Sequence, residues 1–113
     1  MRLKRAREHN ERHLDFIREL PCAVCAAQFA TEAAHLRAGN LKFGKLPAGM
    51  QEKPSDKWTL PLCSACHRDQ HDVNEERFWK ARGINPWVLA MSLYNCSGDY
   101  ELAATVLERS RDD

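Results

Sequence analysis

Four of the five cysteines form two closely spaced pairs, and this spacing is typical of a metal site. Two residues separate the members of each pair and 37 residues separate the pairs, which are Cys22 with Cys25 and Cys63 with Cys66. A gap of two residues lets one turn present two thiolates to a zinc ion at about 2.3 Å. A redox pair would be expected beside a βαβ pattern, which this sequence lacks. The pairs therefore predict a structural zinc site, with four unrelated buried thiols as the alternative.

Two histidines follow the second cysteine pair in the same predicted helix. His67 and His71 are four residues apart, so both imidazoles lie on one face of a helix and within reach of one cation. At roughly 100° per residue, this face points about 90° away from the thiols on average. One short helix could therefore serve zinc on one side and a second cation on the other. Two alternatives remain open: one of these histidines replaces Cys66 as a zinc ligand, or both are ordinary solvated side chains.

A further histidine, His35, lies toward the end of a predicted strand over residues 29–37. A neutral imidazole near pH 7 can accept a proton from water that attacks a phosphodiester, so His35 is a candidate general base. The alternative is a partly buried polar residue that closes the strand. His9 and His13 are interpreted as solvated residues of the charged N-terminal helix, and Cys96 as a small buried side chain.

The elements that would carry these residues are short. Apolar spacing, caps and breakers predict helices over 2–20, 64–74, 75–83, 86–94 and 98–110 and strands over 29–37 and 57–62. A long irregular loop is predicted over 38–57, and loops of this length are usually functional or disordered. Five large side chains are predicted to lie in the core: Trp58, Phe78, Trp79, Trp87 and Leu89.

The 113 residues suit a single domain with a modest core, for which a metal is a common staple. The net charge of +1 is unevenly distributed: residues 1–20 and 37–57 carry an excess of Lys and Arg, and residues 58–113 an excess of Asp and Glu. A basic front half fits a polyanionic partner. Neither a membrane-spanning run nor a signal-peptide core is found, so we expect a cytoplasmic protein in which thiols stay reduced.

The order of these motifs resembles the HNH nuclease superfamily. The segments that carry the resemblance are Cys22-x-x-Cys25, "AAH" ending at His35, and "PLCSACHRDQH" at 61–71. The wider pattern over about residues 20–87 resembles small phage and prophage HNH proteins of the recombination-enhancement type, which include recombinase-dependent DNA nucleases. The resemblance implies an α+β fold with a small zinc-stapled ββα-metal (HNH/His-Me finger) core at 21–87. An N-terminal helix (1–20) and a C-terminal helical extension (88–113) would pack on this core.

The same resemblance implies roles for individual residues. His35 would be the general base, while His67 and His71 would hold a catalytic Mg²⁺, Mn²⁺ or Zn²⁺ ion. The four paired cysteines would hold structural zinc, although relatives often have His in place of Cys66. Ala34 stands where many relatives have a further cation ligand. The usual Asn that orients the base is missing, so either Asp56 takes over its role or the base is less constrained.

These observations predict a metal-dependent endonuclease that hydrolyses DNA, and the alternative is a non-catalytic, zinc-stapled nucleic-acid-binding module. A third possibility, which does not exclude the first, is that the acidic C-terminal helices contact a partner such as a recombinase filament or another phage protein. Five basic residues are candidate phosphate contacts, or else simply solvated: Arg37, Lys42, Lys45, Lys53 and Lys57.

Overall fold

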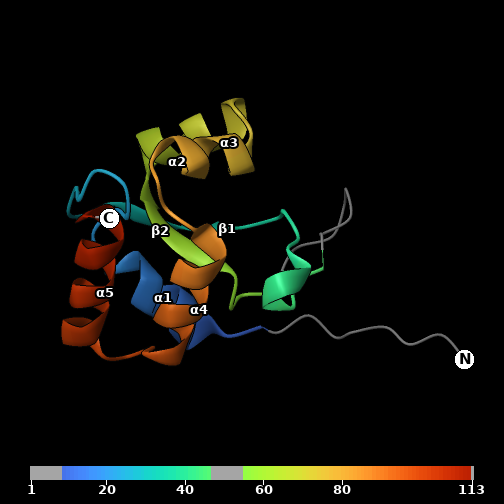
Figure 1. Ribbon diagram of the computed structural model, residues 1–113. Helices are drawn as coiled ribbons and strands as arrows, with labels where there is room; N and C mark the ends of the chain where they lie inside the picture. Colours follow the sequence, from blue (N-terminus) through green and yellow to red (C-terminus); the bar gives the residue numbers. More distant parts are fainter. Residues whose placement is uncertain (1–8, 47–54, 113) are drawn as a thin grey trace, which may run out of the picture.

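The computed structural model describes residues 9–46 and 55–112, and Figure 1 shows how their elements are arranged. In chain order these elements are α1 Glu11–Arg18, β1 Thr31–His35, the 3-10 helix η1 Leu41–Phe43, β2 Thr59–Cys63, α2 Ser64–Asp72, α3 Glu75–Ala81, α4 Pro86–Asn95 and α5 Tyr100–Asp112. Within the described residues, α-helices surround one two-stranded sheet. The predicted α+β class is therefore confirmed.

The strands β1 and β2 form an antiparallel hairpin whose two ends carry the candidate site residues. The register places Thr31 opposite Cys63 at one end and His35 opposite Thr59 at the other. The first four residues of β2 are buried, as expected for a short apolar strand inside a core. Part of the predicted loop between the strands forms η1, and residues 47–54 lie outside the described part of the chain.

The first helix is shorter than the sequence predicts. Within the described residues it begins at Glu11, because Asn10 has a non-helical backbone and its side chain accepts a hydrogen bond from the His13 N–H. Asn at this position satisfies one of the free N–H groups of the first turn and so defines a helix start. The predicted start at residue 2 lies outside the described residues, and the predicted helical conformation at His9 and Asn10 is wrong.

His13 was expected to be solvated, and this expectation is wrong because its side chain is fully buried. It lies on the inward stripe of α1 together with Leu14 and Ile17. The ring packs edge-on against Tyr94 with centroids 4.8 Å apart, and Nδ1 lies 2.8 Å from Ser97 Oγ. His13 therefore joins α1 to the end of α4 and the residues that follow it. His9 is largely exposed, as expected.

The second helix follows the hairpin without an intervening loop, since Cys63 is both the last residue of β2 and the N-cap of α2. A buried hydrogen bond of 2.8 Å from Trp79 Nε1 to Gln70 Oε1 joins α3 to α2. The Glu75 carboxylate, at the start of α3, accepts hydrogen bonds from the N–H of Arg37 and of the next residue. The α2–α3 pair is thereby attached to the chain that leaves β1.

The last two helices pack together, and α4 also packs against β2 of the hairpin (Figure 1). Asn85 caps α4, and Pro86 occupies its first turn, where a missing N–H costs nothing. Trp58, Phe78, Trp79 and Leu89 are buried, which confirms their predicted place in the core, whereas Trp87 is partly buried against it. Across the described ranges, no helix is both long enough and apolar enough to cross a membrane.

Candidate metal and catalytic sites

The four paired cysteines converge at the end of the hairpin where Thr31 faces Cys63. Their sulfur atoms all lie within 4.8 Å of one another, and Cys25 Sγ and Cys63 Sγ are 3.7 Å apart. Four thiolates around one tetrahedral zinc ion lie roughly 3.8 Å apart when each Zn–S bond is about 2.3 Å. The cluster can therefore hold a metal such as zinc with little rearrangement, as the spacing of the cysteines predicts.

Backbone hydrogen bonds shape the turn that carries the first cysteine pair. The Cys22 N–H donates to the Ala27 carbonyl, and the Cys22 carbonyl accepts from Ala26 N–H. Ala26, Phe29 and Ala30 have positive φ angles of 63°, 71° and 56°, which cost free energy in residues other than glycine. These angles are also why β1 begins at Thr31 and not at residue 29 as predicted. The backbone around the first cysteine pair is thus strained, and a metal bound to Cys22 and Cys25 would stabilise this conformation.

The second cysteine pair lies at the first turn of α2, and its two thiols have different surroundings. A hydrogen bond from the Cys66 backbone N–H lowers the pKa of Cys63 to about 7, whereas burial raises the pKa of Cys66. Metal ligation requires thiolates, so metal must displace the proton of Cys66 on binding. Cys96 is buried on the C-cap of α4, where its thiol lies 3.7 Å from the Leu93 carbonyl, and it is not part of the cluster.

At the opposite end of the hairpin, His35 is paired with a buried carboxylate. His35 Nε2 lies 2.8 Å from Asp56 Oδ1, and Asp56 has no exposed surface. Asp56 Oδ2 accepts the Asn10 N–H at 2.8 Å and lies 3.1 Å from His9 Nδ1. Because a carboxylate only accepts, this arrangement assigns the ring proton of neutral His35 to Nε2 and leaves Nδ1 free to accept another. The side chain of His35 is 26% exposed, so water can reach it.

His67 and His71 lie side by side on α2, with ring centroids 4.9 Å apart. Glu32 of β1 faces them, and its Oε1 lies 2.7 Å from His67 Nδ1. This hydrogen bond lowers the pKa of Glu32. Ala34 is 1% exposed and offers no ligand atom. Among the described residues, the four cysteines are the sole set of three or more ligand-type side chains close enough to share a metal ion.

The candidate phosphate contacts differ in their surroundings. Lys45 is 3% exposed, and its Nζ donates to the carbonyls of Arg37 and Leu46 at 3.1 Å each. Burial lowers the pKa of Lys45. Its ammonium group joins the chain before η1 to the chain after it. The expectation that Lys45 presents its charge to a phosphate is therefore not met. Lys42 is exposed, and the Lys57 ammonium lies 5.2 Å from the centroid of the Trp58 ring.

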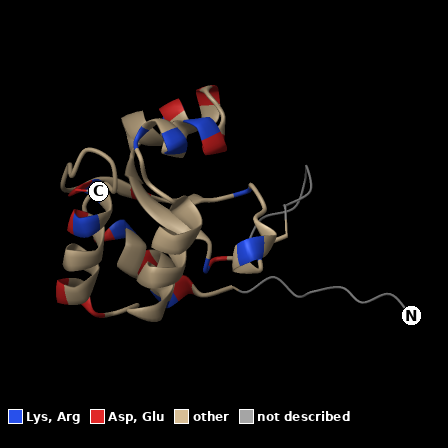
Figure 2. Ribbon diagram, viewed as in Figure 1, with Lys and Arg blue, Asp and Glu red and all other residues tan. Residues whose placement is uncertain are grey.

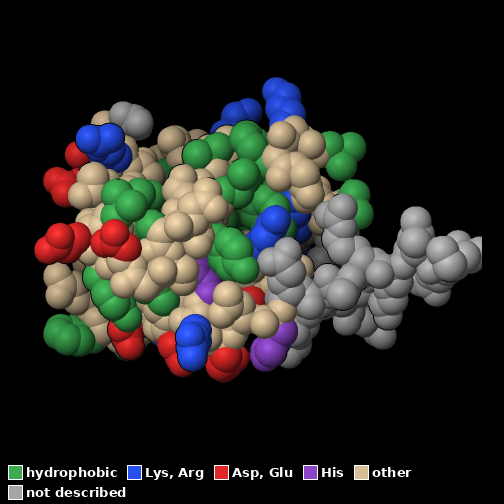
Figure 3. Space-filling view, turned by 90° about the horizontal axis from the view of Figure 1, so that it is seen from below, with side chains coloured by type: hydrophobic (Ala, Val, Ile, Leu, Met, Phe, Trp, Pro, Cys, Tyr) green, Lys and Arg blue, Asp and Glu red, His purple; other side chains and the backbone are tan. Residues whose placement is uncertain are grey.

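The remaining basic residues do not define a single basic surface in the described part of the chain. Arg37 is half-buried beside Glu75, and Lys53 lies outside the described residues. Figure 2 shows that basic and acidic residues are interspersed along α2, α3 and α5. The face in Figure 3 likewise mixes basic, acidic and hydrophobic side chains. A strongly charged binding surface is thus not evident from the described residues.

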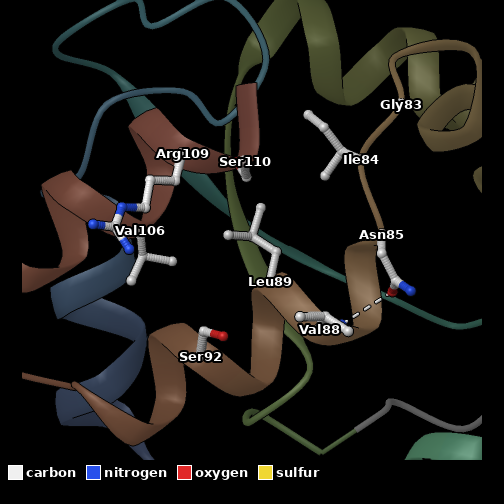
Figure 4. Close-up of a pocket in the computed structure, with 9 residues that line it drawn as sticks. All are labelled: Gly83, Ile84, Asn85, Val88, Leu89, Ser92, Val106, Arg109 and Ser110. Carbon is white, nitrogen blue, oxygen red and sulfur yellow. Dashed lines mark hydrogen bonds between the residues drawn. The ribbon is translucent and has the colours of Figure 1, made fainter. Parts of the chain in front are cut away.

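A hollow of about 350 Å³ lies between α4 and α5, as Figure 4 shows. Val88, Leu89 and Val106 line it, and the Arg109 side chain lies at its edge. The Asn85 side chain beside it caps α4 by accepting from the Val88 N–H at 3.1 Å. None of its lining residues is a cysteine or histidine, so the hollow is separate from both candidate sites.

Most of the chain matches the model of a known protein family. The family model described as "Protein of unknown function (DUF968)" matches residues 1–97, which include all the cysteines and histidines discussed above. Neither a curated protein nor a solved structure matches the chain.

Proposed function

Since the chain belongs to the DUF968 family, whose description assigns no function, we propose from its site residues that it is a metal-dependent endonuclease of the HNH type. Its reaction would be the hydrolysis of DNA phosphodiester bonds. The observation that supports this most is the contact of 2.8 Å between His35 Nε2 and the buried Asp56 carboxylate. A histidine oriented in this way by a carboxylate is a common form of general base.

The proposed role of His35 is to take a proton from the attacking water at Nδ1. Asp56 then stabilises the imidazolium that forms, because its carboxylate lies against the other ring nitrogen. The Asn10 N–H donates to the second oxygen of Asp56 and holds the carboxylate in place. In this proposal Asp56 fills the orienting role that an asparagine has in the HNH nucleases that the motifs resemble.

The proposed cation site consists of His67 and His71, whose adjacent rings suit Mn²⁺, Zn²⁺ or, with more water ligands, Mg²⁺. A bound cation would stabilise negative charge on the scissile phosphate and on the leaving 3′ oxygen. Because Ala34 supplies no ligand, water and the substrate phosphate would complete the coordination. Zinc on the four cysteines would be structural and would hold the hairpin and α2 together.

The cellular setting in the proposal follows from the resemblance of the motifs. It is a phage or prophage protein that acts in the cytoplasm of a bacterial host and is linked to DNA recombination. DNA contacts would come from the exposed Lys42, from Lys57 and from Arg37, with Lys53 as a further candidate. A recombinase filament or another phage protein is the proposed macromolecular partner.

The test is nicking of supercoiled plasmid and cleavage of single-stranded DNA by zinc-loaded protein freed of loosely bound metal. Mg²⁺, Mn²⁺, Ni²⁺ or Zn²⁺ is then added back. We expect metal-dependent cleavage that falls at least about 100-fold in His35→Ala, the loss typical of a missing general base. Zinc content and melting temperature should be unchanged. Asn95→Ala, exposed at the end of α4, is the control. Undiminished cleavage by folded His35→Ala would contradict the assignment.

A second function is favoured by one observation. Ala34 is buried without a ligand atom, and no third ligand-type side chain joins His67 and His71 closely enough in the part of the chain that the structure describes. This arrangement fits a non-catalytic, zinc-stapled nucleic-acid-binding module. Such a module would leave both DNA substrates uncut with every added metal but would still retard them in gel electrophoresis, and His35→Ala would not alter that binding.

A further inference from the structure

We infer that Glu32 is a positioning residue for the proposed cation site, in which its carboxylate fixes the ring of His67 so that Nε2 faces the cation. This inference depends on the proposed function to the extent that the histidines of α2 bind a cation. It adds a residue that the cysteine and histidine motifs do not contain.

The contact between Glu32 and α2 is made by both carboxylate oxygens. Oε1 lies 2.7 Å from His67 Nδ1, and Oε2 accepts a hydrogen bond of 3.3 Å from Ser64 Oγ. The Glu32 side chain is 48% exposed and that of His67 is 24% exposed. The pair therefore lies at the surface, where a cation from solvent has access, and Ser64 limits the rotation of the carboxylate.

This contact determines which nitrogen of His67 is available. An ionised carboxylate has no hydrogen to donate, so Nδ1 of His67 must carry the proton in the hydrogen bond. The neutral ring then has its lone pair on Nε2, which is the form that binds a metal. Histidine ligands almost always donate their other N–H to a carboxylate, a carbonyl or water, and removal of that partner usually weakens metal binding 10–100-fold.

The position of His71 agrees with a shared cation. Two imidazoles that bind one ion at the usual metal–nitrogen distance of about 2.0–2.1 Å have ring centres roughly 4.5–5 Å apart. The centroids of His67 and His71 are 4.9 Å apart, and the rings are tilted by 30°. Both rings can therefore reach one ion with small rotations.

The strand places Glu32 where it can support this site. Side chains alternate along β1, so Glu32 and the buried Ala34 belong to the same face of the hairpin. His67 lies beside Glu32, while Glu75, eight residues after His67, contacts the backbone just after His35. Hence α2 contacts β1, and the start of α3 lies beside the residues that follow β1. The Glu32 carboxylate therefore places negative charge near the proposed cation site, on the face where Ala34 has no charged group.

The first experiment measures the tautomer of His67 by long-range ¹H–¹⁵N correlation in the zinc-loaded protein without added cation. We expect the Nδ1–H form in the wild type and in Glu32→Gln, whose amide oxygen can still accept the hydrogen bond. Glu32→Ala should lose this preference. An Nε2–H tautomer in the wild type would overturn the inference, whether or not the protein is a nuclease.

The second experiment titrates the same proteins with Mn²⁺ and follows the free ion by electron paramagnetic resonance. Glu32→Ala is expected to bind Mn²⁺ 10–100-fold more weakly, and Glu32→Gln should recover part of that loss. Glu76→Ala, an exposed glutamate of α3, is the matched control. His67→Ala should lose binding altogether.

The outcomes separate the inference from the proposed function. If His67→Ala abolishes Mn²⁺ binding and Glu32→Ala leaves it unchanged, Glu32 has no positioning role and the cation site stands. Equal losses in Glu32→Gln and Glu32→Ala would make Glu32 a direct ligand and would also overturn the inference. If neither His67→Ala nor His71→Ala alters Mn²⁺ binding, the cation site and the inference fail together, whereas the role of His35 is still decided by cleavage.

Discussion

The two ends of the β1–β2 hairpin are assembled in different ways. At the end where Thr31 faces Cys63, two local cysteine pairs supply all four sulfur atoms of the cluster. At the other end, the partners of Asp56 come from separate segments, with His35 on β1 and both His9 and Asn10 before α1. The cysteine cluster can be recognised from short spacings in the sequence, whereas the contacts of Asp56 form only when distant segments meet in the folded chain.

This difference has an energetic counterpart. A metal bound to the cysteines would cross-link segments that are far apart in the chain, and such binding adds directly to the free energy of folding. The His35 end of the hairpin is held by hydrogen bonds to the buried Asp56 carboxylate. Each of these bonds contributes no more than about 3 kcal/mol to the free energy of folding. We therefore expect changes at the cysteine end to affect the whole fold and changes at the His35 end to be more local.

The largest effect is expected for Cys22→Ser. Apparent zinc-binding free energies of about 10–16 kcal/mol in small zinc domains are comparable to or exceed the total stability of a domain, which is about 5–15 kcal/mol. Loss of one thiolate should therefore remove zinc and unfold the protein. The measurements are zinc per chain by mass spectrometry of the metal and the melting temperature by circular dichroism.

Cys96→Ala is the control for that change, since Cys96 is buried but lies outside the sulfur cluster. It should keep one zinc ion per chain and lose only a small amount of stability. A wild-type protein that purifies without zinc, or a Cys22→Ser variant as stable as Cys96→Ala, would contradict the zinc assignment.

An intermediate effect is expected at the other end of the hairpin. Asp56→Ala leaves the Asn10 N–H without its acceptor and His35 without its carboxylate, which should cost about 2–4 kcal/mol of stability. Asp56→Asn should cost less, because its amide oxygen can still accept one of these hydrogen bonds. Both variants should retain zinc, which denaturant unfolding combined with zinc analysis would show. Zinc loss in the folded Asp56→Asn protein would mean that the two ends are not independent.

The smallest effect is expected from acid titration of His13. Burial lowers the pKa of His13 below its ordinary value of 6.5, and the attraction of Asp56 opposes this only in part. Its Nε2 has no hydrogen-bond partner within the described residues, so a second ring proton would be unsatisfied there. The unfolded chain then binds a proton more readily than the folded chain. Stability should be complete above about pH 6.5 and decline as the pH falls below that value toward the folded-state pKa.

This prediction is checked by urea unfolding between pH 7.5 and pH 5, with zinc in excess because protons compete with the metal for the thiolates. His13→Phe should show a flatter dependence on pH than the wild type. Equal slopes in the two proteins would assign the acid sensitivity to the cysteine end.

Much of the fold could be predicted from the sequence because it depends on local rules. Pro21, Gly83 and Pro86 mark helix ends or starts, and the apolar run in β2 marks a buried strand. The cysteine cluster also follows from local spacing, since each pair lies within one turn. The metal-type cluster is predicted for this reason, whereas the α+β class was expected from the resemblance of the motifs to HNH nucleases.

The remaining features depend on contacts between distant segments. The capping side chain of Asn10 makes the first helix begin later than predicted, and this signal is present in the sequence. The burial of His13 depends on Tyr94 and Ser97, more than 80 residues away, and no local pattern reports it. Strand alternation gives the face on which Glu32 lies, but it does not show that α2 packs beside this face. The Glu32–His67 contact therefore could not be predicted from the sequence.

The double role of Cys63, which is at once a thiol of the cluster and the residue paired with Thr31, has a consequence for strand alignment. A slip of β2 by one residue would turn every side chain of the strand to the opposite face, and it would also draw the Cys63 sulfur about 3.3 Å away from the other thiols. A metal ion bound there would exclude that misalignment. It would thereby set which residue faces His35 roughly 13 Å further along the strand.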